Sequence, residues 1–217
     1  MSENQKLFDD IRKAVIDGDK TAARNLAEES VRRGLDLNEV IDKGFVPGIQ
    51  AVGELWEKGE YFLPELIAGA DCMKAAMEIL HPAMARAHIS SRSLGKVVIG
   101  TIEGDIHDIG KNLVASMLQA SGFEVFDLGA DVKVEKFIEK AEEIGADLIC
   151  ASALLTTTML NQKKLVETLR QKGLAGKYRI LVGGAPASQK WADDIGAQGY
   201  AENAPLAVKA ARALMGR

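Results

Sequence analysis

Along the first 90 residues, apolar positions recur every three or four residues, which is the spacing of amphipathic helices. Asp19 and Asp36 stand where residues that cap helix starts are expected, and Pro64 suits the first turn of a further helix. We expect a bundle of four helices with short connections, bent at Pro47 and interrupted at Pro82. The pattern therefore predicts a helical domain over residues 1–90.

A different pattern begins after residues 91–95, Ser-Arg-Ser-Leu-Gly, which we expect to form a hinge. From there, short runs rich in β-branched and apolar residues alternate with helical stretches. The runs are Lys96–Thr101, Phe123–Gly129, Asp147–Leu154, Arg179–Gly184 and Gln198–Ala201. Such alternation produces βαβ units and a parallel sheet covered by helices on both faces. We therefore predict an α/β domain over residues 91–217, with a flavodoxin-like (Rossmann-like), doubly wound sheet of five strands.

Ligands of doubly wound sheets bind beyond the carboxyl ends of the strands, so a site is sought in the loops that follow them. The loop after the first strand carries Asp105 two residues before His107 and then opens a helix. At that spacing the carboxylate can bind one imidazole nitrogen and leave the other free for a metal. These residues alone leave an alternative open, in which Asp105 or Asp108 caps the helix and the histidine is incidental. A phosphate site is not expected, since the loop lacks a glycine-rich phosphate motif.

Two later loops carry further candidate ligand contacts. Hydroxyl side chains follow the third strand at Ser152 and at Thr156–Thr158, although Thr157 or Thr158 could instead simply start the next helix. Gly183 and Gly184 follow the fourth strand, where they permit the backbone to approach a ligand or merely allow a sharp turn.

The composition favours a cytoplasmic protein without a nucleic-acid or membrane partner. The chain has a net charge of −4 at pH 7 and no basic stripe. No apolar run approaches the ~18 residues of a membrane span, and the N-terminus lacks the pattern of a secretory signal. Two cysteines are too few for a disulfide framework, which agrees with a reducing compartment.

Taken together, the three loops carry a pattern with a known counterpart. Asp105, His107 and Gly110 give D-x-H-x-x-G, Ser152 and Leu154 give S-x-L, and a paired glycine follows at residues 183–184. This pattern resembles the cobalamin-binding domain of methionine synthase and of the corrinoid proteins of methyl-transfer systems. Upstream, the segment Val-Gly-Glu-Leu-Trp-Glu-x-Gly at residues 52–59 and Phe-Leu-Pro at 62–64 resemble the cap module of the same family. The resemblance covers about residues 5 to 215.

The resemblance implies a role for each of these residues. In the family the cofactor binds with its own base detached and its nucleotide tail inside the protein. His107 would then be the lower axial ligand of cobalt, with Asp105 orienting it and the hydroxyl of Thr158 completing the relay. Thr158 departs from methionine synthase, which has serine at this position. Trp56 and Leu63 would cover the upper face of the corrin.

The remaining implied contacts lie in the same loops and after the last strand. Ser152 and Thr156 would contact the buried base, Gly183 and Gly184 would line the slot for the tail, and Asn203 would cap the last helix beside that tail. The full set of expected cofactor contacts is Gly104, Asp105, Ile106, His107, Asp108, Ile109, Gly110, Ser152, Leu154, Leu155, Thr156, Thr157, Thr158, Gly183, Gly184, Ala185, Tyr200, Asn203, Ala204, Trp56 and Leu63.

By this resemblance we expect a corrinoid methyl carrier, the non-catalytic subunit of a multi-component methyltransferase system. Its cofactor would be cobalamin, with cobalt as the metal. Its partners would be a substrate-specific methyltransferase, a second methyltransferase that passes the methyl group to a thiol or to tetrahydrofolate, and a reductive activation protein.

Two other functions compete with the methyl carrier. A cobalamin-sensing regulatory protein would share the cap and the cobalamin domain, but it would add a DNA-binding domain for which this chain has no room. A flavodoxin-like FMN or signalling domain would need its phosphate loop after the first strand, where acidic residues stand instead.

Overall fold

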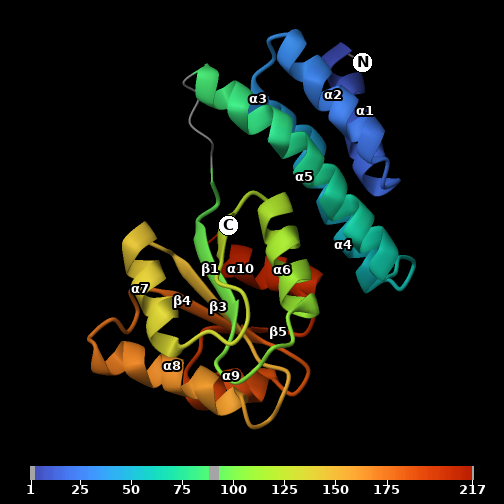
Figure 1. Cartoon of the computed structure of the whole chain (residues 1–217). Coiled ribbons are helices and arrows are strands. Elements are labelled where there is room, and N and C mark those ends of the chain that lie inside the picture. Colours follow the sequence, from blue (N-terminus) through green and yellow to red (C-terminus); the bar gives the residue numbers. More distant parts are fainter. Residues whose placement is uncertain (1–2, 88–92, 217) are drawn as a thin grey trace. The chain divides into compact units, whose positions relative to one another are not determined.

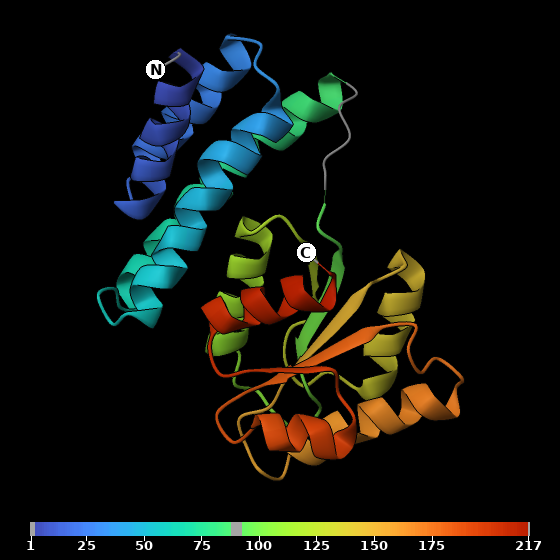
Figure 2. The ribbon, with the colours of Figure 1, turned by 180° about the vertical axis from the view of Figure 1, so that it is seen from behind.

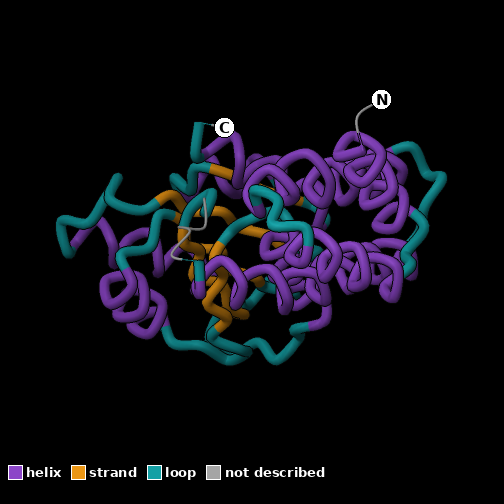
Figure 3. Tube along the Cα trace, turned by 90° about the horizontal axis from the view of Figure 1, so that it is seen from above, coloured by secondary structure: helices purple, strands orange, loops and turns teal. Residues whose placement is uncertain are grey.

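The structure is a computed structural model that describes residues 3–87 and 93–216 (Figure 1). The chain divides into two compact units, one helical and one α/β. The predicted boundary at residues 90 and 91, together with the first two residues of the predicted hinge, lies outside the described residues. In Figure 3 the strands all belong to one unit, and the described part of the other unit is helical.

The helical unit follows the predicted pattern of caps and apolar stripes. Its elements are α1 (Glu3–Ile16), α2 (Lys20–Arg32), α3 (Leu37–Val40), η1 (Ile41–Phe45), α4 (Val46–Glu57) and α5 (Leu63–Arg86). The Asp19 carboxylate accepts a hydrogen bond from the N–H of Ala22 at 2.9 Å, and Asp36 caps α3 in the same way. Because α3, η1 and α4 run on without a break, the described residues form four helical segments, as predicted.

The two internal prolines have different effects. Pro47 lies in the first turn of α4, directly after the π-helical turn η1, in which the N–H of Val46 bonds to the carbonyl of Ile41. Proline lacks an N–H and its ring crowds the preceding turn, which accounts for the wider turn just before it. The predicted interruption at Pro82 is wrong, because α5 continues to Arg86. Leu80 and Met84 are fully buried on either side of this proline, so tertiary packing outweighs the lost hydrogen bond.

The α/β unit contains a parallel sheet with the order β2-β1-β3-β4-β5, which is the predicted flavodoxin-like order. Its strands are β1 (Lys96–Thr101), β2 (Glu124–Asp127), β3 (Leu148–Ser152), β4 (Arg179–Gly183) and β5 (Gly199–Ala201). The intervening helices are α6 (Ile109–Ala120), α7 (Val134–Ile144), α8 (Met159–Gln171), α9 (Gln189–Ile195) and α10 (Ala204–Leu214). Strand β1 pairs with both β2 and β3, and the register places Thr101 opposite Ser152.

Helices cover both faces of this sheet. Helices α7, α8 and α9 share one apolar core with the central strands, and its fully buried members include Phe137, Leu165 and Ala192. Helices α6 and α10 cover the other face (Figure 2). The chain changes from one face to the other between β1 and β3, so the loops after these two strands flank the topological switch point, where ligands of such folds bind.

Both cysteines are buried and free, Cys72 in the helical unit and Cys150 in β3. Burial raises the pKa of the Cys72 thiol to about 11, so this sulfur stays protonated and packs as a small apolar group. Among the described residues, no helix is both long enough and apolar enough to cross a bilayer.

Candidate functional site

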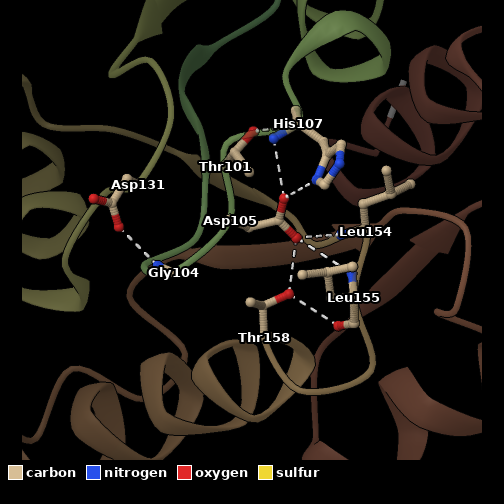
Figure 4. Close-up of polar contacts among 8 residues, drawn as sticks. All are labelled: Thr101, Gly104, Asp105, His107, Asp131, Leu154, Leu155 and Thr158. Atoms are coloured by element: carbon tan, nitrogen blue, oxygen red, sulfur yellow. Dashed lines mark hydrogen bonds and ion pairs between the residues drawn. The ribbon is translucent and has the colours of Figure 1, made fainter.

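The loops after β1 and β3 come together at the carboxyl edge of the sheet (Figure 4). They start side by side, because Thr101 and Ser152 are register partners and the N–H of Ile102 donates to the carbonyl of Ser152 at 2.9 Å. The first loop carries Asp105 and His107, and the second leads into α8. The parallel register therefore brings residues about fifty positions apart into one hydrogen-bonded group.

The carboxylate of Asp105 is the centre of this group. Its Oδ1 atom lies 2.7 Å from Nδ1 of His107 and accepts the backbone N–H of the same residue at 3.0 Å. Its Oδ2 atom accepts the N–H of Leu154 at 2.6 Å, the N–H of Leu155 at 3.3 Å and the hydroxyl of Thr158 at 2.8 Å. The side chain has no solvent-exposed surface. Five donors thus converge on one buried carboxylate.

This environment decides the charge of Asp105. Burial alone would raise the pKa of the carboxyl group, but the hydrogen bonds from His107, Leu154 and Thr158 outweigh burial and hold the pKa well below its usual range. Asp105 is therefore an anion throughout the physiological pH range. An anion at Nδ1 fixes the imidazole as the tautomer that carries its proton on Nδ1.

The contact with Asp105 uses one ring nitrogen of His107, Nδ1. With Nδ1 donating to Asp105, the lone pair of Nε2 is available to a metal, and the side chain is 49% exposed. The hydroxyl of Thr101 donates to the carbonyl of His107 at 3.1 Å and holds the backbone of this turn. The described residues contain no group of three or more histidine, cysteine or acidic side chains that could enclose a metal ion. A single exposed imidazole suits a metal that arrives with most of its own ligands, as cobalt does in a corrin.

Thr158 stands at the N-cap position, directly before α8, but its side chain makes no capping hydrogen bond to that helix. The hydroxyl is buried and lies 2.8 Å from Oδ2 of Asp105 and 2.9 Å from the carbonyl oxygen of Leu155. It has one hydrogen and two acceptors within reach. The helix-capping alternative is therefore wrong for this side chain, whose contacts are directed to Asp105 and Leu155.

Large apolar side chains surround His107 at the surface. Ile106 is 77% exposed and Ile109 is 83% exposed, and Leu154 and Leu155 are also exposed. Isolated exposed apolar residues are ordinary, but four beside one histidine form an apolar surface around a polar ligand atom. That combination suits a broad, largely apolar ligand with a metal at its centre.

The other predicted contacts occupy the same edge of the α/β unit. Thr156, Thr157 and Ala185 are exposed at the surface of their loops. The carbonyl of Gly183 accepts the N–H of Ala153 and the side-chain amide of Gln162, both at 3.1 Å. These two bonds tie the end of β4 to the loop after β3 and to α8.

The last strand and the helical unit carry the remaining predicted contacts. The side chain of Asn203 accepts the N–H of Leu206 at 3.0 Å, so the predicted cap of α10 is confirmed. Tyr200 is half-buried in β5, and burial raises the pKa of its hydroxyl. Trp56 is half-buried at the end of α4, and Leu63 is exposed at the start of α5, so both flank the short turn between these helices. Their contact with a corrin stays a prediction, as do the other cofactor contacts.

Sequence patterns did not identify four residues that shape this edge. Thr101 holds the His107 backbone, Asp131 bonds the loop at Gly104, Asn161 bonds the carbonyl of Glu103, and Gln162 bridges β3 and β4. Thr101 could have been predicted from the sequence, because its hydroxyl stands at the end of the first predicted strand. The other three act through contacts between segments distant in sequence, which no local pattern encodes.

Comparison with known proteins identifies the family of this chain. The B12 binding domain family matches residues 95–209, and a second family, also described as a B12 binding domain, matches residues 7–81. The chain belongs to the family of corrinoid proteins with a B12 binding domain, and its cofactor is cobalamin, whose metal is cobalt.

Relatives align along nearly the whole chain. A corrinoid protein of Desulfitobacterium hafniense is 49% identical over 97% of this chain and 98% of its own length. Trimethylamine corrinoid protein 1 of Methanosarcina acetivorans is 46% identical over 99% of this chain and 100% of its own length. The crystal structure of the methanol:cobalamin methyltransferase complex from Methanosarcina barkeri contains a chain that matches with a TM-score of 0.84 and 30% identity, covering 97% of this chain and 80% of that one.

Proposed function

We propose that this protein carries methyl groups on cobalamin between two methyltransferases. Bound cobalamin supplies a cobalt ion that can take a methyl group from one partner and give it to another. The observation that carries the proposal is the contact of the Asp105 carboxylate with Nδ1 of His107 at 2.7 Å, which leaves the lone pair of Nε2 available to a metal. Cobalamin would bind with its own base detached and with His107 in its place.

The protein's own residues would control how firmly this ligand is held. A carboxylate that accepts the Nδ1 proton makes the imidazole a better electron donor at Nε2. The hydroxyl of Thr158 and the N–H of Leu154 share the charge of the same carboxylate, so they temper that effect. The exposed Ile106 and Ile109 would lie against the corrin and keep water from the lower face of the metal.

The partners are proposed from the relatives and from the chemistry of the carrier. The names of the relatives include trimethylamine and methanol, so the methyl donor differs among similar chains and would be chosen by the partner enzyme. We assign a substrate-specific methyltransferase that uses a small methylated compound, and a second methyltransferase that delivers the methyl group to a thiol or to tetrahydrofolate. Since reduced cobalt oxidises readily, a reductive activation protein would complete the system. A reducing cytoplasm would suit the two free thiols.

The test is to establish which nitrogen binds cobalt. The protein is labelled with 15N at histidine only, loaded with cobalamin and reduced to the Co(II) form for electron paramagnetic resonance. If a protein histidine is the ligand, the nitrogen splitting changes from a triplet to a doublet upon labelling. The His107→Ala variant should lose this doublet, and the His81→Ala variant, which changes an exposed residue of α5, should keep it.

Two results would contradict the proposal. A triplet that persists in the labelled protein would assign the ligand to the cofactor's own base, and a doublet that survives in His107→Ala would assign it to another histidine. Purification of the loaded protein with a methyltransferase from the same cells would separately test its role as a carrier.

A further inference from the structure

The turn that carries His107 is also held from the side opposite Asp105. The side chain of Asp131, in the loop between β2 and α7, accepts the N–H of Gly104 at 2.7 Å. The backbone N–H of Asp131 donates to the carbonyl of Asp105 at 2.9 Å. Asp131 thus bonds both the N–H of Gly104, as Figure 4 shows, and the carbonyl of Asp105.

These two bonds fix the direction of the Asp105 side chain. Gly104 has a φ angle of +84°, so the chain turns sharply there before it reaches Asp105. With its own carbonyl and the N–H of the preceding residue both bonded, Asp105 can rotate little about its backbone bonds. Its carboxylate is therefore aimed at His107 by contacts that touch neither the imidazole nor a ligand.

Asp131 is itself held firmly enough to act in this way. The loop around it runs along the end of β1, because Thr101 donates its N–H to the carbonyl of Gly129 at 2.9 Å and accepts the N–H of Val132 at 3.0 Å. On the other side of the turn, the side chain of Asn161 in α8 donates to the carbonyl of Glu103 at 2.8 Å. The turn is thus clamped between the β2–α7 loop and α8.

The backbone of Asp131 gives a second, independent indication. Its φ angle of +54° makes it the one non-glycine residue with a positive φ within the described ranges 3–87 and 93–216. Glycine adopts this conformation more easily than aspartate, so conformation alone would favour glycine here. An aspartate supplies what glycine lacks, a carboxylate that accepts the Gly104 N–H. Residues in strained backbone conformations persist where several surrounding contacts hold them in place, and they often lie beside functional sites.

We propose that Asp131 is a positioning residue for the cobalt ligand His107, acting through Gly104 and Asp105. This inference rests on the proposed function, because it takes His107 as the ligand. Loss of the Asp131 carboxylate should leave the fold intact and loosen the Asp105–His107 pair, so that the imidazole binds cobalt less strongly.

The experiment measures ligation by His107 directly. Cobinamide, a corrinoid that lacks the nucleotide tail and its base, is titrated into the full-length protein, and the absorption change upon imidazole ligation gives a dissociation constant. The variant Asp131→Gly, which keeps the backbone conformation and removes the carboxylate, should raise that constant about fivefold, as expected for one lost hydrogen bond. Asp131→Asn keeps a side-chain oxygen acceptor and should restore binding close to that of the wild type.

Controls separate positioning from stability and from failure of the proposed function. Lys133→Ala changes an exposed side chain of the same loop and should leave the dissociation constant unchanged. Urea unfolding midpoints show that each variant is folded, and Asp131→Ala, which also lacks a side-chain acceptor, replaces the glycine variant if that one does not fold. If His107→Ala keeps the absorption change, the proposed function fails. If His107→Ala abolishes it while Asp131→Gly binds like the wild type, the proposed function stands and the role of Asp131 is refuted.

Discussion

The carbonyl oxygen of Ala153 lies so close to Gly184 that an ideal β carbon on the glycine would come within 1.8 Å of it. Gly184 also has a φ angle of +112°, which disfavours other residues. The loop after β4 therefore packs directly on the end of β3. The fold itself requires glycine at this position, whether or not a nucleotide tail passes beside it.

Gly184→Ala should accordingly destabilise the protein even without cobalamin, independently of any effect on cofactor binding. We expect a loss of about 1–3 kcal/mol in the free energy of unfolding, from overpacking against Ala153. Urea denaturation of the protein without cobalamin measures it. Gly173→Ala is the matched control, because Gly173 has a φ angle of +70° but open space around its β position. Equal losses in the two variants would show that backbone strain, not the contact with Ala153, is the cause.

Asp105 should make the stability of the protein depend on pH. In the unfolded chain this carboxyl group has a pKa of about 3.9, and folding lowers that pKa. Asp105 therefore stabilises the fold above that pH, and the contribution is lost as the pH falls through the lower pKa of the folded state. Asp105→Asn should cost about 1–3 kcal/mol near neutral pH, and the difference from the wild type should shrink in acid.

Urea unfolding near neutral pH and at about pH 3 measures this difference. Glu135→Gln, an exposed change in the first turn of α7, should show little effect at either pH. A difference between Asp105→Asn and the wild type that stays constant with pH would mean that the carboxylate charge is unimportant and that only its shape matters.

Thr158 offers a substitution that removes one donor and keeps the shape. Thr158→Val should destabilise the protein by about 1–3 kcal/mol, because the buried Asp105 carboxylate loses a hydrogen bond at 2.8 Å. Thr158→Ser retains the hydroxyl and should cost clearly less. Thermal unfolding compares stability, and cobinamide titration compares ligation by His107. If the serine variant loses stability while the valine variant matches the wild type, the Thr158 methyl group matters and its hydroxyl does not.

A buried ion pair beside the site should respond unequally to the loss of each partner. The ammonium of Lys111 in α6 bonds to Asp127 at the end of β2, and the lysine side chain is only 1% exposed while that of Asp127 is 36% exposed. Asp127→Asn leaves a buried charge without its counter-ion and should approach the lower end of the roughly 3–5 kcal/mol seen for broken buried pairs. Lys111→Met leaves a partly hydrated carboxylate and should cost less. Urea unfolding compares the two variants. We expect a lower midpoint for Asp127→Asn than for Lys111→Met, and the reverse order would contradict the prediction.

Local patterns predicted those parts of this protein that local physics determines. The caps at Asp19, Asp36 and Asn203 bond backbone groups within three residues, and the Asp105–His107 contact spans only two. The strands were recognisable because short runs rich in β-branched and apolar residues alternate with helical stretches. The edge of the sheet that carries the site then followed from the rule for parallel strands.

Residues that act across the fold escaped such prediction. Asp131 lies 27 positions from Gly104, and its role depends on the register between β1 and the β2–α7 loop. Gln162 bonds carbonyls of both β3 and β4, which requires knowledge of which strands are neighbours. Pro82 shows the opposite kind of error. The proline predicts a break in the helix, but burial of the residues around it keeps α5 continuous. In each case the deciding energy comes from tertiary contacts.

The hydroxyl of Thr158 has one hydrogen and two oxygens within reach. This arrangement affects how fast the surroundings of Asp105 can rearrange. When the hydrogen bonding of the Asp105–His107 pair changes, the hydroxyl can turn toward the carbonyl of Leu155 by rotation about a single C–O bond. No heavy atom needs to move, so the reorganisation energy is small. The surroundings of Asp105 can then adjust within the time of a bond rotation, far faster than any exchange of protein partners.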